Sequence, residues 1–348
     1  IIQYILLELT VMNLCFQALN LVILMVISYN KKIMKTIIIT GASGLVATQL
    51  TIDLLDKTDY RILLVSTHPE AISERYETWG NRILCFSLFD LEKYIDEGKS
   101  VDCCINAAFA RSSEGTRLVS SIEFTITLIN ILLKSNLKSF VNISSQSVYG
   151  KNQNNSVETT VLNPDYLYAF GKYTTEIITK LMFRKSNVNW TNIRLASVCE
   201  NARFMNIFVK NALTGVPIHL TAGNQGCSFI DVRDVSSALQ TVIMTDNCRF
   251  EEAYNLGTGE MFTIRQIAEK VKFIGDECYG TSVLITEEES NNQQHVGMDN
   301  KLFTNTFNWN PSYSIDEMIK SLYDMNINVL GRAGGEKFPK AFKIVYHL

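Results

Sequence analysis

The stretch Lys35-Thr-Ile-Ile-Ile-Thr-Gly-Ala-Ser-Gly-Leu-Val-Ala-Thr-Gln-Leu50 decides the fold. Its β-branched run, residues 36–40, is short and apolar enough for a strand buried on both faces. Small residues follow at 41–44, and the apolar spacing from Leu45 to Leu55 suits a helix packed on a sheet. The N–H groups of such a turn and of the helix N-terminus face one point, which suits a pyrophosphate.

The glycine spacing in this turn is Gly-x-x-Gly-x-x-Ala, in place of the commoner Gly-x-Gly-x-x-Gly. Gly41 and Gly44 let the backbone turn sharply and approach phosphates, and Ala47 lets the helix lie close to the strand. An ordinary strand-to-helix turn can show the same spacing. The dinucleotide interpretation therefore depends on the strand before the turn and the helix after it.

Length, charge and cysteine content exclude several classes of protein. The 348 residues suffice for one large α/β domain or two lobes. A formal net charge of −3 shows no basic excess, so we expect no nucleic-acid partner. Eight scattered cysteines without a Cys-x-x-Cys pair, and four histidines without ligand spacing, indicate reduced thiols in a cytoplasmic protein and no structural metal.

The two ends of the chain are considered apart from the fold. Residues 1–33 form an apolar leader, in which Leu9 to Ile27 carries no charge. This leader is either a membrane anchor or upstream translated sequence. We expect the second, because polar residues interrupt it and Met34 directly precedes the first strand. The protein would meet a membrane only if the leader is a true anchor. Residues 331–348 are expected to form a loose tail.

Strands and helices alternate from Met34 onward. Four more strands are expected at 61–65, 83–86, 103–106 and 140–144. Helical segments are expected near 45–55, 71–79, 91–95 and 118–133. This alternation predicts an α/β fold with a doubly wound parallel sheet, whose ligand crevice lies at the carboxyl ends of the strands.

A second group of residues is suited to acid–base chemistry. Ser144 and Ser145 end a buried strand, and Tyr168 and Lys172 are four residues apart on a predicted helix, so they share one face. A phenol with a pKa of about 10 is a poor base at neutral pH, and a neighbouring ammonium favours the phenolate. Ser145 can hold a substrate hydroxyl or carbonyl. Tyr-x-x-x-Lys also occurs by chance, but the serine-rich strand end and the glycine turn favour a catalytic site.

Taken in order, these motifs resemble an extended short-chain dehydrogenase/reductase of the NAD-dependent epimerase/dehydratase family, which acts on nucleotide sugars. The matching segments are Thr40-Gly-Ala-Ser-Gly44, Asn106-Ala-Ala108, Ser144-Ser-Gln-Ser-Val-Tyr-Gly150, Tyr168-x-x-x-Lys172, Arg194-Leu-Ala-Ser-Val198, Ser228-Phe-Ile-Asp-Val-Arg-Asp-Val235, Tyr254-Asn-Leu-Gly-Thr-Gly259, and Asn308-Trp-Asn-Pro311 with Ser314-Ile-Asp-Glu317. The resemblance covers about residues 34–325.

The resemblance implies a Rossmann-type domain over 34–198, with returning segments near 228–260, and a smaller C-terminal substrate-binding lobe from 199–227 and 261–330. It implies NAD or NADP as cofactor and Ser145, Tyr168 and Lys172 as the catalytic residues. The implied cofactor-binding residues are Gly41, Ser43, Gly44, Leu45, Ser66, Thr67, Asn106, Ala107, Ala108 and Lys172. The implied substrate-binding residues are Ser145, Ser197 and Cys227.

The chain differs from the family at positions that determine cofactor and substrate specificity. Ser66-Thr67-His68 stands where an NAD-specific member usually has an acid, so the choice between NAD and NADP stays open. Ser197 and Cys227 stand where members often have a substrate-binding asparagine and a diphosphate-binding arginine. Gln146-Ser147 replaces the Asp-Glu pair of the dehydratase branch, which disfavours dehydration.

Three functions follow for comparison. The first is a nucleotide-sugar 4-epimerase, which removes a hydride and returns it to the other face of a keto-sugar intermediate. The second is an NAD(P)H-dependent reductase of a keto sugar or another small carbonyl compound. The third is a non-catalytic NAD(P)-binding sensor, against which the presence of Ser145, Tyr168 and Lys172 together argues. The resemblance also implies a homodimer through the helices near 118–133 and Tyr168. The sugar and the nucleotide stay open.

Overall fold

The structure is a computed structural model that describes residues 34–332 except 152, 222, 247 and 289–294. The predicted leader lies outside the described residues. So does the predicted tail, apart from residues 331 and 332, which end helix α11 (Ile315–Arg332).

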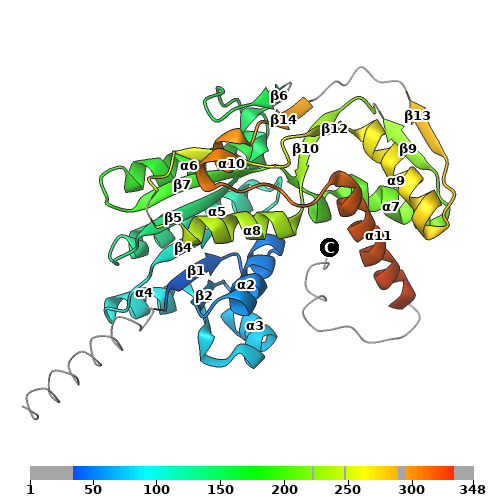
Figure 1. The fold of residues 1–348 in the computed structure, drawn as a ribbon. Helices are drawn as coiled ribbons and strands as arrows, with labels where there is room; N and C mark the ends of the chain where they lie inside the picture. The colour runs from blue at the N-terminus through cyan, green and yellow to red at the C-terminus, as the bar shows by residue number, and fades with distance from the viewer. Residues whose placement is uncertain (1–33, 152, 222, 247, 289–294, 333–348) are drawn as a thin grey trace, which may run out of the picture. The chain divides into compact units, whose positions relative to one another are not determined.

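Seven parallel strands form the central sheet (Figure 1). Their spatial order is β3 (Ile83–Phe86), β2 (Arg61–Val65), β1 (Thr36–Thr40), β4 (Cys103–Asn106), β5 (Ser139–Ser145), β7 (Asn189–Leu195) and β11 (Ala253–Leu256). Along the described chain the sheet begins with β1, β2 and β3 are added on one side of it, and β4 then begins the other side. The order therefore reverses between β1 and β4, where open α/β sheets bind ligands. The predicted doubly wound parallel sheet is confirmed.

Alternate residues of each strand face opposite layers of helices. Ile37 and Ile39 of β1 join the core beneath α2 (Leu45–Lys57) and α8 (Val232–Met244), which pack against each other (Figure 1). Ile38 joins the core beneath the three helices of the other face. Those helices are α4 (Leu88–Asp96), α5 (Gly115–Leu132) and α6 (Leu167–Phe183). Burial on both faces explains why the strands are continuous apolar runs.

The expected elements are found, with shifted ends. Strands at 36–40, 61–65, 83–86 and 103–106 are confirmed, and β5 is one residue longer at each end than expected. The segment expected to be helical near 71–79 is divided into α3 (Pro69–Ser73) and a 3-10 helix, η1 (Glu74–Arg82). Gly80 interrupts η1 with a φ of +53°, a conformation that an α-helix does not contain.

A second apolar core lies among α7 (Arg203–Thr214), α9 (Ile264–Tyr279) and α11. Two small sheets accompany it. The first has the order β12 (Met261–Thr263), β10 (Gly226–Ile230), β14 (His295–Met298), β6 (Gln153–Ser156), and β8 (Ser197–Val198) pairs with β10. The second consists of β13 (Ile285–Glu288) and β9 (Ile218–Thr221). Helix α10 (Lys301–Phe307) falls in the range predicted for the lobe, yet Phe303 and Phe307 pack on Tyr254 of the central sheet, with ring centroids 5.8 and 5.1 Å away. The division into lobes stays our proposal, with α10 belonging to the sheet.

Two of the motifs noted in the sequence bind each other. The Asp234 carboxylate, in the first turn of α8, accepts hydrogen bonds from the backbone N–H groups of Ser312 (2.9 Å) and Tyr313 (3.1 Å). Trp309 Nε1 donates to Ser237 Oγ at 2.7 Å. These contacts join α8 to the segment that precedes α11, so folding alone accounts for much of both motifs.

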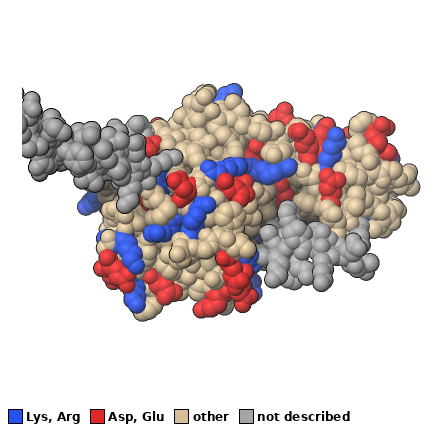
Figure 2. Space-filling model, turned by 60° about the horizontal axis from the view of Figure 1, so that its bottom comes forward, with Lys and Arg blue, Asp and Glu red and all other residues tan. Residues whose placement is uncertain are grey.

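The surface mixes charges of both signs. On the face shown in Figure 2, acidic and basic side chains lie near one another, which agrees with the small formal net charge of −3. Within the described ranges, none of the helices combines the length and the apolar character needed to cross a membrane.

Candidate active site

The glycine turn between β1 and α2 leaves open backbone at the point where the strand order reverses. Gly41 has a φ of +70°, and a Cβ there would lie 2.9 Å from the backbone of Ala107 and Ala108. Gly44 is the N-cap of α2 and carries no capping side chain, so the first N–H groups of the helix suit an anion. The turn therefore fits the pyrophosphate of a dinucleotide.

A ladder of buried side chains holds the strand ends around this turn. Thr40 Oγ1 donates to Asn106 Oδ1 (2.8 Å), Asn106 Nδ2 donates to Asn142 Oδ1 (3.1 Å), and Asn142 Nδ2 donates to Asn192 Oδ1 (2.9 Å). We call these four residues the asparagine ladder; they come from β1, β4, β5 and β7. The Ala108 N–H donates to Thr40 Oγ1 at 3.0 Å, which fixes the loop after β4 beside the glycine turn.

One cavity of about 1140 Å³ brings the predicted catalytic residues together. Ser145 is the last residue of β5, and Tyr168 and Lys172 lie on successive turns of α6. All three line the cavity, together with Gly41 and Gly44 of the glycine turn. The Tyr168 and Lys172 side chains, which the i, i+4 spacing places on one helix face, therefore line the same cavity as Ser145 at the strand end.

Lys172 is almost completely enclosed, with 5% of its surface exposed. Its Nζ donates to the Ile143 carbonyl oxygen (2.8 Å) and lies 4.4 Å from the centroid of the Phe109 ring. Burial lowers the pKa of Lys172 to about 7, although Glu176 acts to raise it. In this environment the ammonium can lose its proton near neutral pH.

The Tyr168 ring is half-buried between two other aromatic rings. It stacks on Tyr166 (centroids 6.2 Å apart, 18° between planes) and meets Phe109 edge to face (5.8 Å, 77°). Burial raises the pKa of Tyr168 to about 12, and Tyr166 adds to this effect, whereas Arg111 and the Ser145 hydroxyl lower it. The phenol is therefore neutral at physiological pH in this state, and forming a phenolate requires further positive charge.

The predicted substrate residues lie at the other side of the same cavity. Ser197 and Cys227 both line it. The Ser197 hydroxyl is hydrogen-bonded to the side-chain amide of Gln146 at 3.0 Å. Burial raises the pKa of the Cys227 thiol to about 12, so this thiol is neutral. Neither Ser197 nor Cys227 therefore carries a charge, whereas the family often has an arginine at the position of Cys227.

The predicted cofactor residues separate into two groups. Gly41, Gly44, Leu45, Ala107 and Lys172 line the cavity. Ser43, Ser66, Thr67, Asn106 and Ala108 fall outside the set of described residues that line it. The Asn106 side chain is turned into the sheet by the asparagine ladder, and the Ser66 hydroxyl accepts a hydrogen bond from the His68 N–H at 3.1 Å.

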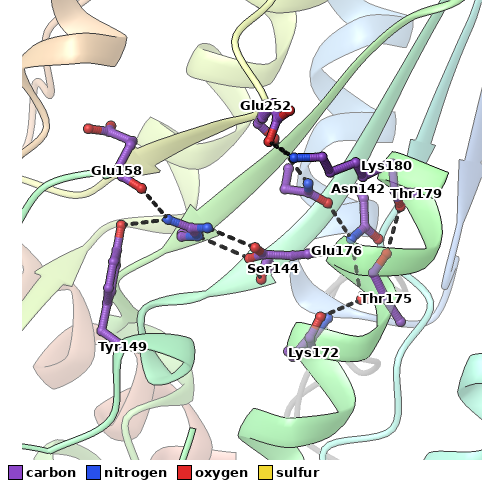
Figure 3. A network of polar contacts seen from close by, with 12 residues as sticks. Asn142, Ser144, Tyr149, Glu158, Lys172, Thr175, Glu176, Thr179, Lys180 and Glu252 are labelled. Atoms are coloured by element: carbon purple, nitrogen blue, oxygen red, sulfur yellow. Dashed lines mark hydrogen bonds and ion pairs between the residues drawn. The ribbon is translucent and has the colours of Figure 1, made fainter. Parts of the chain in front are cut away.

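Four residues that the sequence analysis did not single out belong to the site or support it. Phe109 and Arg111 line the cavity, and Arg111 Nη1 donates to the Asn201 carbonyl oxygen at 2.9 Å. Glu176 and Arg194 form a buried ion pair behind the predicted catalytic residues, at 2.8 Å (Figure 3). The sequence signal for Glu176 was present, since an acid four residues after Lys172 shares its helix face.

Comparisons with known proteins agree with this geometry. A family model described as "NAD dependent epimerase/dehydratase family" matches residues 37–257. The chain is 21% identical over 314 residues to the low-salt glycan biosynthesis protein Agl12 of Haloferax volcanii, covering 83% of this chain and 97% of that protein. It is 23% identical over 345 residues to a UDP-glucose 4-epimerase of Caenorhabditis elegans, covering 83% and 96%.

Solved structures share the fold. The UDP-glucuronic acid 4-epimerase of Bacillus cereus, in complex with UDP-glucuronic acid and NAD, superposes with a TM-score of 0.72 at 18% identity, covering 84% of this chain and 99% of that one. The UDP-glucose 4-epimerase of Thermotoga maritima superposes with a TM-score of 0.69 at 20% identity, covering 85% and 99%. At these identities the likeness establishes the architecture alone.

Proposed function

This chain belongs to the NAD dependent epimerase/dehydratase family, and from that premise we propose that it is a nucleotide-sugar 4-epimerase. The observation that carries the proposal is the single cavity lined by the glycine turn, Ser145, Tyr168 and Lys172. Pockets for one small ligand measure roughly 300–1,000 Å³. The 1140 Å³ found here favours a dinucleotide together with a second molecule.

Five residues are proposed to hold the cofactor, because they line the cavity near the glycine turn: Gly41, Gly44, Leu45, Ala107 and Lys172. When bound, the nicotinamide supplies the hydride chemistry. The Bacillus cereus 4-epimerase was crystallised with NAD, which favours NAD for this chain. Ser66 and Thr67, in place of an acid at the end of β2, keep NADP as an alternative.

We propose that the triad of Ser145, Tyr168 and Lys172 carries out the proton transfers. Tyr168, as the phenolate, takes the proton from a sugar hydroxyl that Ser145 holds by a hydrogen bond, and later returns it. Because burial holds the pKa of Tyr168 at about 12, the phenolate needs cationic neighbours. The Arg111 guanidinium, which lowers the pKa of Tyr168, and the Lys172 ammonium, 6.0 Å from the centroid of the Tyr168 ring, are the nearby cations that can supply that charge.

Epimerisation is favoured over dehydration by the residues after Ser145. Gln146 and Ser147 are both buried, at 6% and 8% exposure, and both line the cavity. An amide and a hydroxyl are not acids at neutral pH, so they cannot serve as the carboxylate pair that eliminates water. The similar proteins include both UDP-glucose 4-epimerases and a dTDP-glucose 4,6-dehydratase, so the choice rests on Gln146 and Ser147.

A nucleotide sugar is favoured as substrate because cationic side chains line the cavity. Arg111, Lys151 and Arg203 contribute to its wall, and a diphosphate is an anion that such groups attract. Lys151 is partly neutralised by Asp165, 3.3 Å away. A small neutral carbonyl compound has no anionic group for these side chains to bind, so we place it second to a nucleotide sugar as the substrate.

The direct test uses the purified protein and a series of UDP-, dTDP-, CDP- and GDP-hexoses. We expect interconversion of one 4-epimer pair without net change in the cofactor, and loss of at least ~10³-fold in Tyr168→Phe. Net consumption of NADPH would identify a reductase instead. Equal results for the wild type and Tyr168→Phe in every assay would support the non-catalytic sensor. Mass spectrometry of co-purified small molecules identifies the nucleotide.

A homodimer through α5 and α6 is proposed as well. Val119, Phe170, Ile177 and Leu181 are large apolar side chains that these two helices expose, and such clusters commonly mark interfaces. Leu181→Asp should halve the mass measured by light scattering. Leu284→Asp, which changes an exposed leucine elsewhere, should not. A monomeric wild type would contradict this proposal without affecting the enzymatic one.

A further inference from the structure

Glu176 is a buried acid one helical turn beyond Lys172, with 6% of its surface exposed. Its carboxylate accepts hydrogen bonds from Ser144 Oγ (2.5 Å) and from Arg194 Nε (3.1 Å) and Nη2 (2.8 Å) (Figure 3). Ser144 directly precedes Ser145. One carboxylate therefore joins the helix that carries Tyr168 and Lys172 to the strand end that carries the third catalytic residue.

Arg194 extends the same network to the segment after Ser145. Its Nη1 donates to Tyr149 Oη (2.9 Å) and to the Glu158 carbonyl oxygen (3.1 Å) (Figure 3). Tyr149 Oη in turn donates to Asn255 Oδ1 (2.7 Å). Tyr149 closes the 3-10 helix η2 (Gln146–Tyr149), which begins directly after Ser145. Both sides of Ser145 are thus tied to the Glu176–Arg194 pair.

Glu176 also supplies negative charge to Lys172. It raises the pKa of Lys172 against the larger lowering effect of burial. The other titratable or charged groups around this region are Tyr168 on the same helix, Arg194 on β7 and Arg111 on the loop after β4. The strand β5 contributes uncharged groups, namely the Ile143 carbonyl and the Ser144 hydroxyl.

We propose that Glu176 is a positioning residue of the active site: with Arg194 it holds the Ser145 strand end against the Tyr168–Lys172 helix, and it provides the anion that Lys172 faces. This inference rests on the proposed function, because it concerns the same triad. Two apolar side chains could fill this space without the desolvation cost of a buried ion pair. The effect of Glu176 on the Lys172 ammonium explains why a charged Glu176–Arg194 pair is present here.

The test compares three variants. Glu176→Gln alone leaves Arg194 as an unpaired buried cation, which destabilises a fold strongly. The decisive variant is therefore Glu176→Gln/Arg194→Met, which removes both charges and keeps similar volumes. Glu252→Gln is the matched control, because Glu252 pairs with Lys180 farther along the same helix (2.7 Å) but is exposed (Figure 3).

The first readout is the reactivity of Lys172 toward acetic anhydride over a pH series, measured by mass spectrometry without substrate. We expect the double variant to stay folded and its labelling midpoint to fall by about one pH unit, because Glu176 is the member of the pair whose charge acts on Lys172. Glu252→Gln should label like the wild type. An unchanged midpoint in the folded double variant, or an equal fall in Glu252→Gln, would overturn the inference.

The second readout is the coupling to Ser145. If Glu176 and Arg194 act through the strand end, the double substitution should lower kcat about thirtyfold alone but less than about threefold in a Ser145→Ala background. Losses that simply multiply would assign the pair to general stability and overturn the inference. If the wild type turns over no nucleotide sugar, the proposed function fails, while the Lys172 labelling still decides the role of Glu176.

Discussion

Phe109 rests on Gly171: a Cβ at position 171 would lie 2.8 Å from Cζ of the Phe109 ring. The same ring covers the Lys172 ammonium at 4.4 Å and meets the Tyr168 ring edge to face. Since Gly171 lies between these two residues on α6, a missing side chain on the helix makes room for the ring that encloses both proposed catalytic groups.

Gly171→Ala is therefore expected to lower activity without lowering stability. The new methyl group displaces the ring and lets water reach Lys172, while alanine favours the helix by up to about 1 kcal/mol over glycine. We expect kcat to fall at least ~10-fold and the melting temperature to stay or rise. Gly115→Ala in α5, where the space around a Cβ is open, is the matched control and should keep full activity. Full activity in Gly171→Ala would contradict the role given to Phe109.

Gly41→Ala should abolish cofactor binding. Its φ of +70° strains an alanine, and the methyl group would press on the backbone of Ala107 and Ala108, which cannot yield as a side chain can. Gly98 has a similar φ of +75° with open space around it, so Gly98→Ala carries the strain alone and should cost about 1 kcal/mol. Titration of NAD followed by thermal shift measures the difference, and equal NAD binding by both variants would refute it.

Lys172 should make stability depend on pH. Burial lowers its pKa to about 7 in the folded state, whereas an unfolded lysine titrates at about 10.4. Between these values the unfolded chain binds the proton and the folded chain does not, so stability rises with pH across this window. Below it, the full cost of burying the ammonium is present.

Lys172→Met removes that cost. We expect the variant to be the more stable protein near neutral pH, by an amount on the order of a few kcal/mol. The advantage should shrink as the pH rises toward the ordinary lysine pKa. Urea midpoints of both proteins over a pH series measure this, and an advantage that grows with pH would show that the assignment is wrong.

Asn142→Leu should destabilise the sheet itself. Asn142 joins Asn106 to Asn192 in the asparagine ladder, and its loss leaves Asn106 Nδ2 and Asn192 Oδ1 short of a buried partner. Unpaired buried polar groups cost about 1–3 kcal/mol each. We expect a lower urea midpoint, whereas Asn211→Leu, which removes an exposed contact to Pro217, should change it little. Equal midpoints for the two variants would mean that the ladder contributes nothing.

Features that depend on the spacing of residues close in the sequence could be predicted. The strand 36–40 could be predicted because a parallel strand buried on both faces is a short apolar run, and the Tyr168–Lys172 pair because a helix repeats near four residues. The division of the 71–79 segment after Ser73 was missed, because helical spacing does not show where an α-helix changes to a 3-10 helix.

Contacts between distant parts of the chain could not be predicted in this way. Phe109 was passed over because its role appears only when the loop after β4 lies on Gly171. Arg194 pairs with Glu176 because helix α6 packs on strand β7, an adjacency that spacing does not reveal. Asn106 stays a predicted cofactor-binding residue, and spacing did not reveal that the alignment of β4 with β1 and β5 places its side chain in the asparagine ladder.

The hydrogen bonds from Ser312 and Tyr313 to Asp234 bear on how the protein is made. A nascent chain that has emerged from the ribosome only as far as β11 has all seven strands but lacks the partners of an acid at the start of α8. A product truncated before Trp309 should therefore be cleared by proteases, and a smaller working enzyme should not be obtainable by trimming that end.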